Sequence, residues 1–77
     1  MIVSKLQPGD TFKDSHGNQV SVMSVEAKGE WVNCDLKVLT GHAKGRQHGA
    51  SFLVTAKGID LGEKAGDFVP ANRRSLS

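Results

Sequence analysis

The residues with the clearest capacity for chemistry gather in one glycine-rich stretch of this chain, Thr40–Ala50, where glycine recurs at every fourth position. Glycines let a backbone approach a phosphate closely, and the intervening Lys44 and Arg46 supply positive charge and hydrogen-bond donors. The stretch is not a P-loop, because no Gly-Lys-Ser/Thr motif ends it and no helical pattern follows. Phosphate contact is therefore one interpretation of this loop. A solvated connection charged for solubility and a protein contact are the others.

The distribution of charge says more than its sum, since a formal net charge of +2 is too small by itself to indicate nucleic acid. Positions 37 to 48 contain three cations, two histidines and no acidic residue, and two arginines follow near the C-terminus. Elsewhere the two signs are mixed. The candidate phosphate-binding residues are Lys37, Lys44, Arg46, Arg73 and Arg74.

Trp31 is the only tryptophan, and strand alternation turns it away from the face that holds Val32 and Cys34. Together with Lys37 it is available to stack on a base or to receive a side chain of a protein partner. Burial of Trp31 under a terminal segment is the alternative. Exposure of Met23 would strengthen the binding interpretation.

The histidines and the single cysteine do not form a catalytic or metal-binding pattern. His42 and His48 do not have a ligand spacing, and His16 lies in a separate turn. Cys34, in mid-strand on the apolar face, should have a raised pKa and be a poor nucleophile. We therefore expect no metal, no cofactor and no catalytic residue, and we expect that the protein is not an enzyme. An active site formed across a homo-oligomer ranks third among the functions considered.

Residues 19–39 are the element on which the rest of the chain depends, and they predict a β-hairpin. Two β-rich runs, Val20–Glu26 and Trp31–Leu39, flank the polar turn Ala27–Glu30, whose glycine can take a positive φ. In the second run, every other residue is apolar. This alternation predicts a strand with one buried face.

Several further short strands, separated by glycine turns, predict an all-β protein of five or six antiparallel strands that form a small barrel or sandwich, in one domain over residues 1–70 with a flexible tail at 71–77. Further strands are expected at Thr11–Lys13 and Ser51–Ala56, with a last edge strand at Asp67–Val69. Ile2–Leu6 is either a first edge strand or a mobile lead-in, and Ile59–Leu61 is either a short strand or a single 3₁₀ turn. The expected core is Leu6, Phe12, Val20, Val22, Val25, Val32, Cys34, Leu36, Val38, Phe52, Val54, Ile59 and Phe68.

The single cysteine excludes an internal disulfide and fits a reducing compartment. No apolar run approaches the length of a membrane span, and the first residues lack the pattern of a signal peptide. We therefore expect a cytoplasmic protein with no membrane contact.

The segment Leu6–Val25 resembles the opening of SH3-like small barrels, including KOW-type domains. Its Pro8, Gly9 and Asp10 form a turn that leads into a short strand, a glycine turn and an alternating valine strand. The resemblance covers roughly the first half of the chain. It implies that the chain folds as a small five- or six-stranded antiparallel barrel of the SH3-like kind, and SH3-like barrels include nucleic-acid binders, peptide binders and assembly modules.

The leading hypothesis from the sequence is a weak, electrostatic nucleic-acid binder that uses the cations named above, with Trp31 for stacking. The alternative is a protein-interaction or regulatory accessory module, for example of a phage or plasmid, that uses Trp31, Met23 and the edge strands. The sequence leaves the oligomeric state open.

Overall fold

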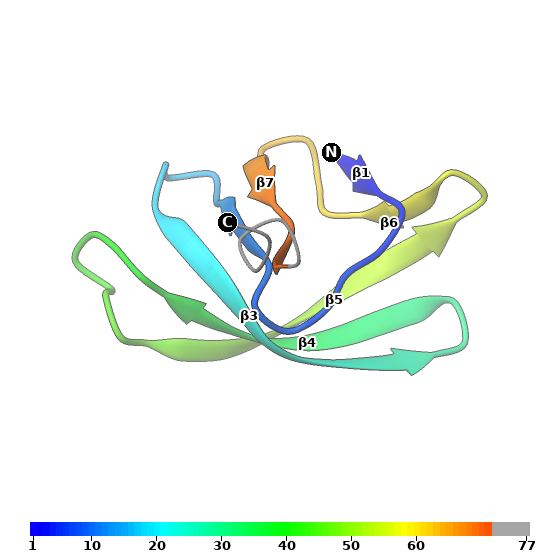
Figure 1. Cartoon of the computed structure of the whole chain (residues 1–77), viewed down its shortest axis with the longest axis horizontal. Coiled ribbons are helices and arrows are strands. Elements are labelled where there is room, and N and C mark those ends of the chain that lie inside the picture. The colour runs from blue at the N-terminus through cyan, green and yellow to red at the C-terminus, as the bar shows by residue number, and fades with distance from the viewer. Residues whose placement is uncertain (72–77) are drawn as a thin grey trace.

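The structure is a computed structural model and describes residues 1–71. All seven strands belong to one antiparallel sheet with the order β1-β6-β5-β4-β3-β2-β7 (Figure 1). Every neighbouring pair except β1–β6 and β2–β7 is consecutive in the chain, so hairpin connections build most of the sheet. The strands are β1 (Ile2–Val3), β2 (Thr11–Lys13), β3 (Gln19–Lys28), β4 (Trp31–Val38), β5 (Gln47–Thr55), β6 (Gly58–Asp60) and β7 (Gly66–Val69).

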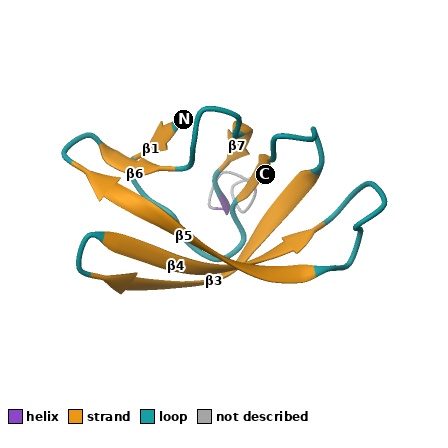
Figure 2. Ribbon diagram, turned by 180° about the vertical axis from the view of Figure 1, so that it is seen from behind, coloured by secondary structure: helices purple, strands orange, loops and turns teal. Residues whose placement is uncertain are grey.

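The sheet curls into a half-barrel, with β3, β4 and β5 as its floor and the short strands β1 and β7 across the opening (Figures 1 and 2). The fold class is therefore the predicted one, an all-β antiparallel small barrel of the SH3-like kind, although it has seven strands rather than five or six. The part of the chain that the structure describes has no helix long and apolar enough to cross a membrane.

The core lies on the inner face of the curl. Of the expected core, Val25, Phe52, Ile59 and Phe68 are partly buried against the cluster, and the prediction for Val54 was wrong, because this side chain is 39% exposed. Its backbone N–H donates to the carbonyl of the turn residue Glu30, so no β4 strand residue lies opposite Val54 to cover it. The fully buried members of the expected core are Leu6, Phe12, Val20, Val22, Val32, Cys34, Leu36 and Val38, and Leu61 joins them.

The predicted hairpin over residues 19–39 is confirmed, with a tighter turn than expected. β3 continues to Lys28, which pairs with Trp31, so only Gly29 and Glu30 form the turn. Gly29 has a φ of 59°, which fits a type II′ turn with glycine at its first central position. Because type II′ matches the twist of the flanking strands, both strands stay paired to the end of the hairpin.

A β-bulge interrupts the β3–β4 ladder at Met23. The register shifts between Val22, opposite Leu36, and Ser24, opposite Asp35, so Met23 is the extra residue. The shift restores Val25 to the inner face beside Val22, one position out of the alternation that begins at Val20.

The loop between β4 and β5 is shorter than predicted. Strand β5 begins at Gln47, so the last four residues of the predicted loop Thr40–Ala50 belong to the sheet. Gly49 is opposite Asp35 in the ladder and does not have the positive φ of Gly41 (85°) and Gly45 (91°). A glycine in this position therefore acts as an extended strand residue.

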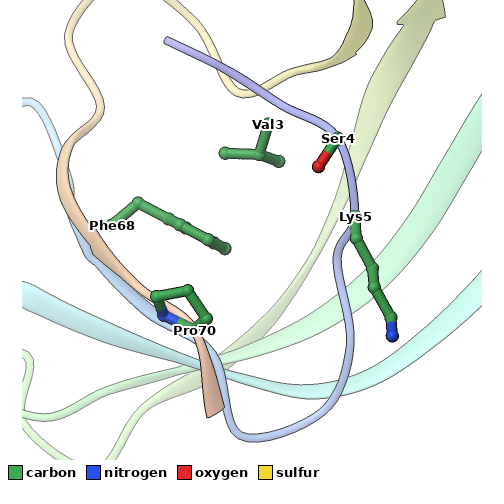
Figure 3. Close-up of a pocket in the computed structure, with 5 residues that line it drawn as sticks. All are labelled: Val3, Ser4, Lys5, Phe68 and Pro70. Atoms are coloured by element: carbon green, nitrogen blue, oxygen red, sulfur yellow. The ribbon is translucent and has the colours of Figure 1, made fainter. Parts of the chain in front are cut away.

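The two edge strands do not pair, and the barrel remains open between them. A cavity of about 350 Å³ occupies this seam, lined by Val3, Ser4, Lys5, Phe68 and Pro70 (Figure 3). Of the predicted tail, only Ala71 is within the described residues, so Arg73 and Arg74 lie outside them.

Candidate nucleic-acid interface

The β4–β5 connection, Leu39–Arg46, is called the cationic loop below. It folds as a compact double turn: the N–H of Lys44 donates to the Gly41 carbonyl (3.2 Å) and that of Arg46 to the Ala43 carbonyl (2.9 Å). The Gly45 N–H donates to the carbonyl of Val38, the last residue of β4 (2.7 Å). The backbone is therefore fixed by its own hydrogen bonds, while its charged side chains point to solvent.

The base of the cationic loop is tied to the start of β3. The Leu39 N–H donates to the Gln19 carbonyl (2.7 Å), and the Gln19 N–H donates to Oγ1 of Thr40 (2.9 Å). Gly41 lies so close to the side chain of Asn18 that a Cβ at position 41 would collide with it. The turn that contains His16 and the cationic loop consequently occupy the same end of the sheet, at the left of Figure 1.

Three of the predicted phosphate-binding residues come together at this end. Lys44 and Arg46 are exposed, and Lys37, at the end of β4, pairs with Gln47 directly after Arg46. Within residues 1–71 the only ion pair joins Lys13 to Asp67 (3.2 Å), so no carboxylate in that range neutralises the three cations. Arg73 and Arg74 remain predictions.

Trp31 is exposed (48%), which excludes burial under the described terminal segments, but it is not at the cationic loop. It starts β4, whereas Lys37 comes near its end, six residues or about 20 Å further at about 3.3 Å per residue. Asp35 stands on the same face between them, hydrogen-bonded to Ser24 Oγ (2.8 Å). The structure therefore separates the predicted stacking residue from the predicted phosphate contacts.

The residues that sequence reasoning missed surround Trp31. Leu53 on β5 is its cross-strand partner and is 40% exposed, while Lys28 pairs with it from β3. Met23, which the sequence did single out, is 45% exposed but lies at the bulge, five residues before Lys28 and away from Trp31. Leu53 follows Phe52 in an apolar run, and only the register of β5 against β4 shows which of the two faces outward.

Cys34 is buried on the inner face opposite Ala50. Desolvation, and secondarily the negative charge of Asp35, raise the pKa of its thiol, so the reactive thiolate is disfavoured at neutral pH. Among the described residues no three His, Cys, Asp or Glu side chains gather in a way that could hold a metal ion. What this end of the molecule offers chemically is exposed, unneutralised positive charge on a fixed backbone.

Comparison with known proteins adds no assignment: no protein-family model, curated protein or solved structure matches this chain.

Proposed function

We propose that the protein binds nucleic acid through the cationic loop. The observation that carries this proposal is that Lys37, Lys44 and Arg46 converge at one end of the sheet with no carboxylate of the described residues paired to them. Charges of this kind attract the phosphate backbone without reading sequence, so binding is electrostatic and weak at physiological salt.

The fixed backbone of the cationic loop supports the same proposal. Four hydrogen bonds hold the double turn and its closure on β4, so ordering the loop on binding costs less than ordering a flexible segment. Trp31 has no part in this contact, because a nucleic-acid strand that reached both the cationic loop and Trp31 would have to pass the carboxylate of Asp35. A reducing compartment such as the cytoplasm remains our proposal for the location, on the ground of the single buried thiol.

The test is fluorescence anisotropy with labelled single-stranded and double-stranded oligonucleotides at low salt. We expect binding that weakens steeply with added salt, and loss of most of it in the double variant Lys44→Ala/Arg46→Ala. Removing two phosphate contacts should reduce the slope of log K against log salt by about 1.4 for single strands and about 1.8 for duplexes.

The matched control is Lys57→Ala/Lys64→Ala, which removes the same charge from two exposed turns away from the cationic loop. It should leave the slope nearly unchanged. No binding at low salt, or an equal loss in the control, would refute the proposal.

A second candidate, a protein-interaction module, is favoured by a different observation. Trp31 and its cross-strand partner Leu53 are large apolar side chains left 48% and 40% exposed on the floor of the half-barrel, and Met23, 45% exposed, lies further along β3 at the bulge. Exposed aromatic and aliphatic side chains that lie together often mark protein contacts. Loss of a protein contact in Trp31→Ala, with the circular dichroism spectrum unchanged, would support it. Retention of that contact would exclude Trp31 from the interface.

A further inference from the structure

One row of side chains crosses the outer face of five strands. In antiparallel ladders, paired residues point to the same face, so Lys28, Trp31, Leu53, Asp60 and Ile2 follow one another from β3 through β4, β5 and β6 to β1. Trp31 (48% exposed), Leu53 (40%) and Ile2 (44%) are the apolar members. The row has a tryptophan–leucine centre with a cation on one side and a carboxylate on the other.

If a second copy presents the same row in reverse order, the cation of each copy faces the carboxylate of the other, and the tryptophan faces the leucine. We infer that the outer face binds a second copy of this chain, face to face, about a two-fold axis that runs parallel to the strands between β4 and β5. In that arrangement Trp31 of each copy packs on Leu53 of the other, and Lys28 of each copy faces Asp60 of the other. The inference deepens the second candidate function, since it names the partner of the Trp31 surface.

The remaining positions of the face fit the same axis. Along β4 and β5 the next cross-strand pairs are Asn33 with Ser51 and Asp35 with Gly49. The axis sets each member of these pairs against the other member in the second copy, so the carboxylate of Asp35 lies over a glycine.

The alternative axis, across the strands, fails on charge. Centred on the same row, it would place Lys28 against Lys28 and Asp60 against Asp60, which is repulsive. Charge complementarity therefore selects a single arrangement, in which the two sheets have aligned strands, the geometry common for packed sheets.

The area needed is within reach of the molecule. A specific interface requires about 1,000 Å² in total, or about 500 Å² from each copy. That is about a tenth of the 5156 Å² surface of the chain. The contact is centred on β4 and β5, where the exposed Trp31–Leu53 pair lies, and extends to Lys28 on β3 and Asp60 on β6. We therefore expect a reversible, concentration-dependent dimer.

The first experiment measures mass and tryptophan emission over the same dilution series. Sedimentation equilibrium should show a monomer–dimer transition. The emission of Trp31, the sole indole, should shift to shorter wavelength on association with the same midpoint, because its surroundings become apolar. A monomer at all concentrations, or a dimer whose emission equals that of the monomer, would overturn the inference.

The second experiment exchanges the charges. Lys28→Glu and Asp60→Lys should each weaken self-association about tenfold or more, because each places like charges at both flanks. An equimolar mixture of the two variants should recover the affinity, since opposite charges again meet at both flanks. Failure of the mixture to recover would overturn the inference.

Loss of the dimer must be distinguished from loss of the fold, and the two charged positions allow this. Lys28 is exposed, whereas the Asp60 carboxylate also accepts the Gly62 N–H (2.9 Å). Asp60→Asn retains an acceptor for that bond while removing the charge, and it too should weaken the dimer, in proportion to the lost attraction. Trp31→Ala should abolish dimerisation without changing the circular dichroism spectrum. A dimer that survives in Trp31→Ala uses another surface and refutes the assignment.

The two proposals fail separately. None of these variants alters the cationic loop, so loss of the dimer with retained oligonucleotide binding concerns the Trp31 face alone. Loss of oligonucleotide binding in Lys44→Ala/Arg46→Ala with an intact dimer concerns the cationic loop alone.

Discussion

Asp10 is a fully buried side chain (1% exposed), and its carboxylate satisfies backbone donors from both ends of the chain. Oδ2 accepts the Gln7 N–H (2.8 Å), and Oδ1 accepts the N–H of Ala71 (2.7 Å), sixty-one residues away. The backbone carbonyl of Asp10 also accepts the Val22 N–H (2.8 Å). One residue thus joins the first turn, the chain after β7 and the long strand β3.

We predict that Asp10→Ala lowers the free energy of unfolding by about 2–4 kcal/mol, because two part-buried backbone N–H groups lose their acceptors. Urea denaturation measures the difference. The control is Asp14→Ala, whose Oδ1 accepts the exposed His16 N–H and the part-buried Asn18 N–H in the turn between β2 and β3, and it should cost less, about 1–2 kcal/mol. Equal losses in the two variants would contradict a special role for Asp10.

At the residue scale, strand alternation was a sufficient guide for β4. It correctly placed Val32 and Cys34 inward and Trp31 outward, because this strand is regular along its whole length. Alternation tells which face of β4 a residue is on, but not how far apart two residues on that face are. Trp31 and the cationic loop lie at opposite ends of β4, and this separation follows from the length of the strand. Leu53 was missed because its facing depends on register rather than on residue type.

Strand β1 can pack beside β6 only because the first residue of β6, Gly58, has no side chain. Its φ is 135°, and a Cβ would lie 2.5 Å from the Val3 carbonyl oxygen. Since β1 has only two residues and pairs only with β6, this close approach is part of a small contact.

We predict that Gly58→Ala displaces β1 and lowers the free energy of unfolding by about 2–3 kcal/mol, from backbone strain and the collision combined. Hydrogen exchange in β1 and β6 should be faster in the variant than in the parent, and exchange in β3 and β4 should change less. Gly29→Ala is the comparison, because its φ is also positive but nothing lies within 4 Å of the added Cβ. It should cost about 1 kcal/mol. Unchanged protection of β1 in Gly58→Ala would contradict this reasoning.

At the element scale, hairpins were easier to predict than their limits. The predicted turn Ala27–Glu30 was too wide and the predicted loop Thr40–Ala50 too long, because glycine was taken to mark non-strand conformation throughout. Gly49 is a strand residue opposite Asp35, and only Gly41 and Gly45 in that stretch have a positive φ. The bulge at Met23 did leave a signal, since Val20 and Val22 are followed by Val25, a break in the period of two.

At the scale of the whole molecule, one core holds the two layers of the half-barrel together. Phe12 on β2 is 5% exposed, and its ring meets that of Phe52 on β5 edge to face, with centroids 6.4 Å apart and planes at 80°. The two strands are not neighbours in the sheet, so this contact spans the interior of the curl. Aromatic pairs of this geometry are worth about 0.5–1.5 kcal/mol beyond the area they bury.

The total stability available sets the consequence of losing this contact. A chain of 77 residues has about 4–12 kcal/mol of unfolding free energy, at about 0.05–0.15 kcal/mol per residue. Replacing a buried Phe by Ala costs about 3–5 kcal/mol. We therefore predict that Phe12→Ala leaves most of the chain unfolded or marginally folded at 37 °C, as seen by loss of the cooperative thermal transition.

Phe12→Leu keeps most of the volume and should retain a cooperative transition at a lower temperature. Leu53→Ala removes a side chain of similar size from the outer face and should leave the monomer nearly as stable as the parent. If Phe12→Ala melted no lower than Leu53→Ala, the half-barrel would not depend on the contact that crosses its interior.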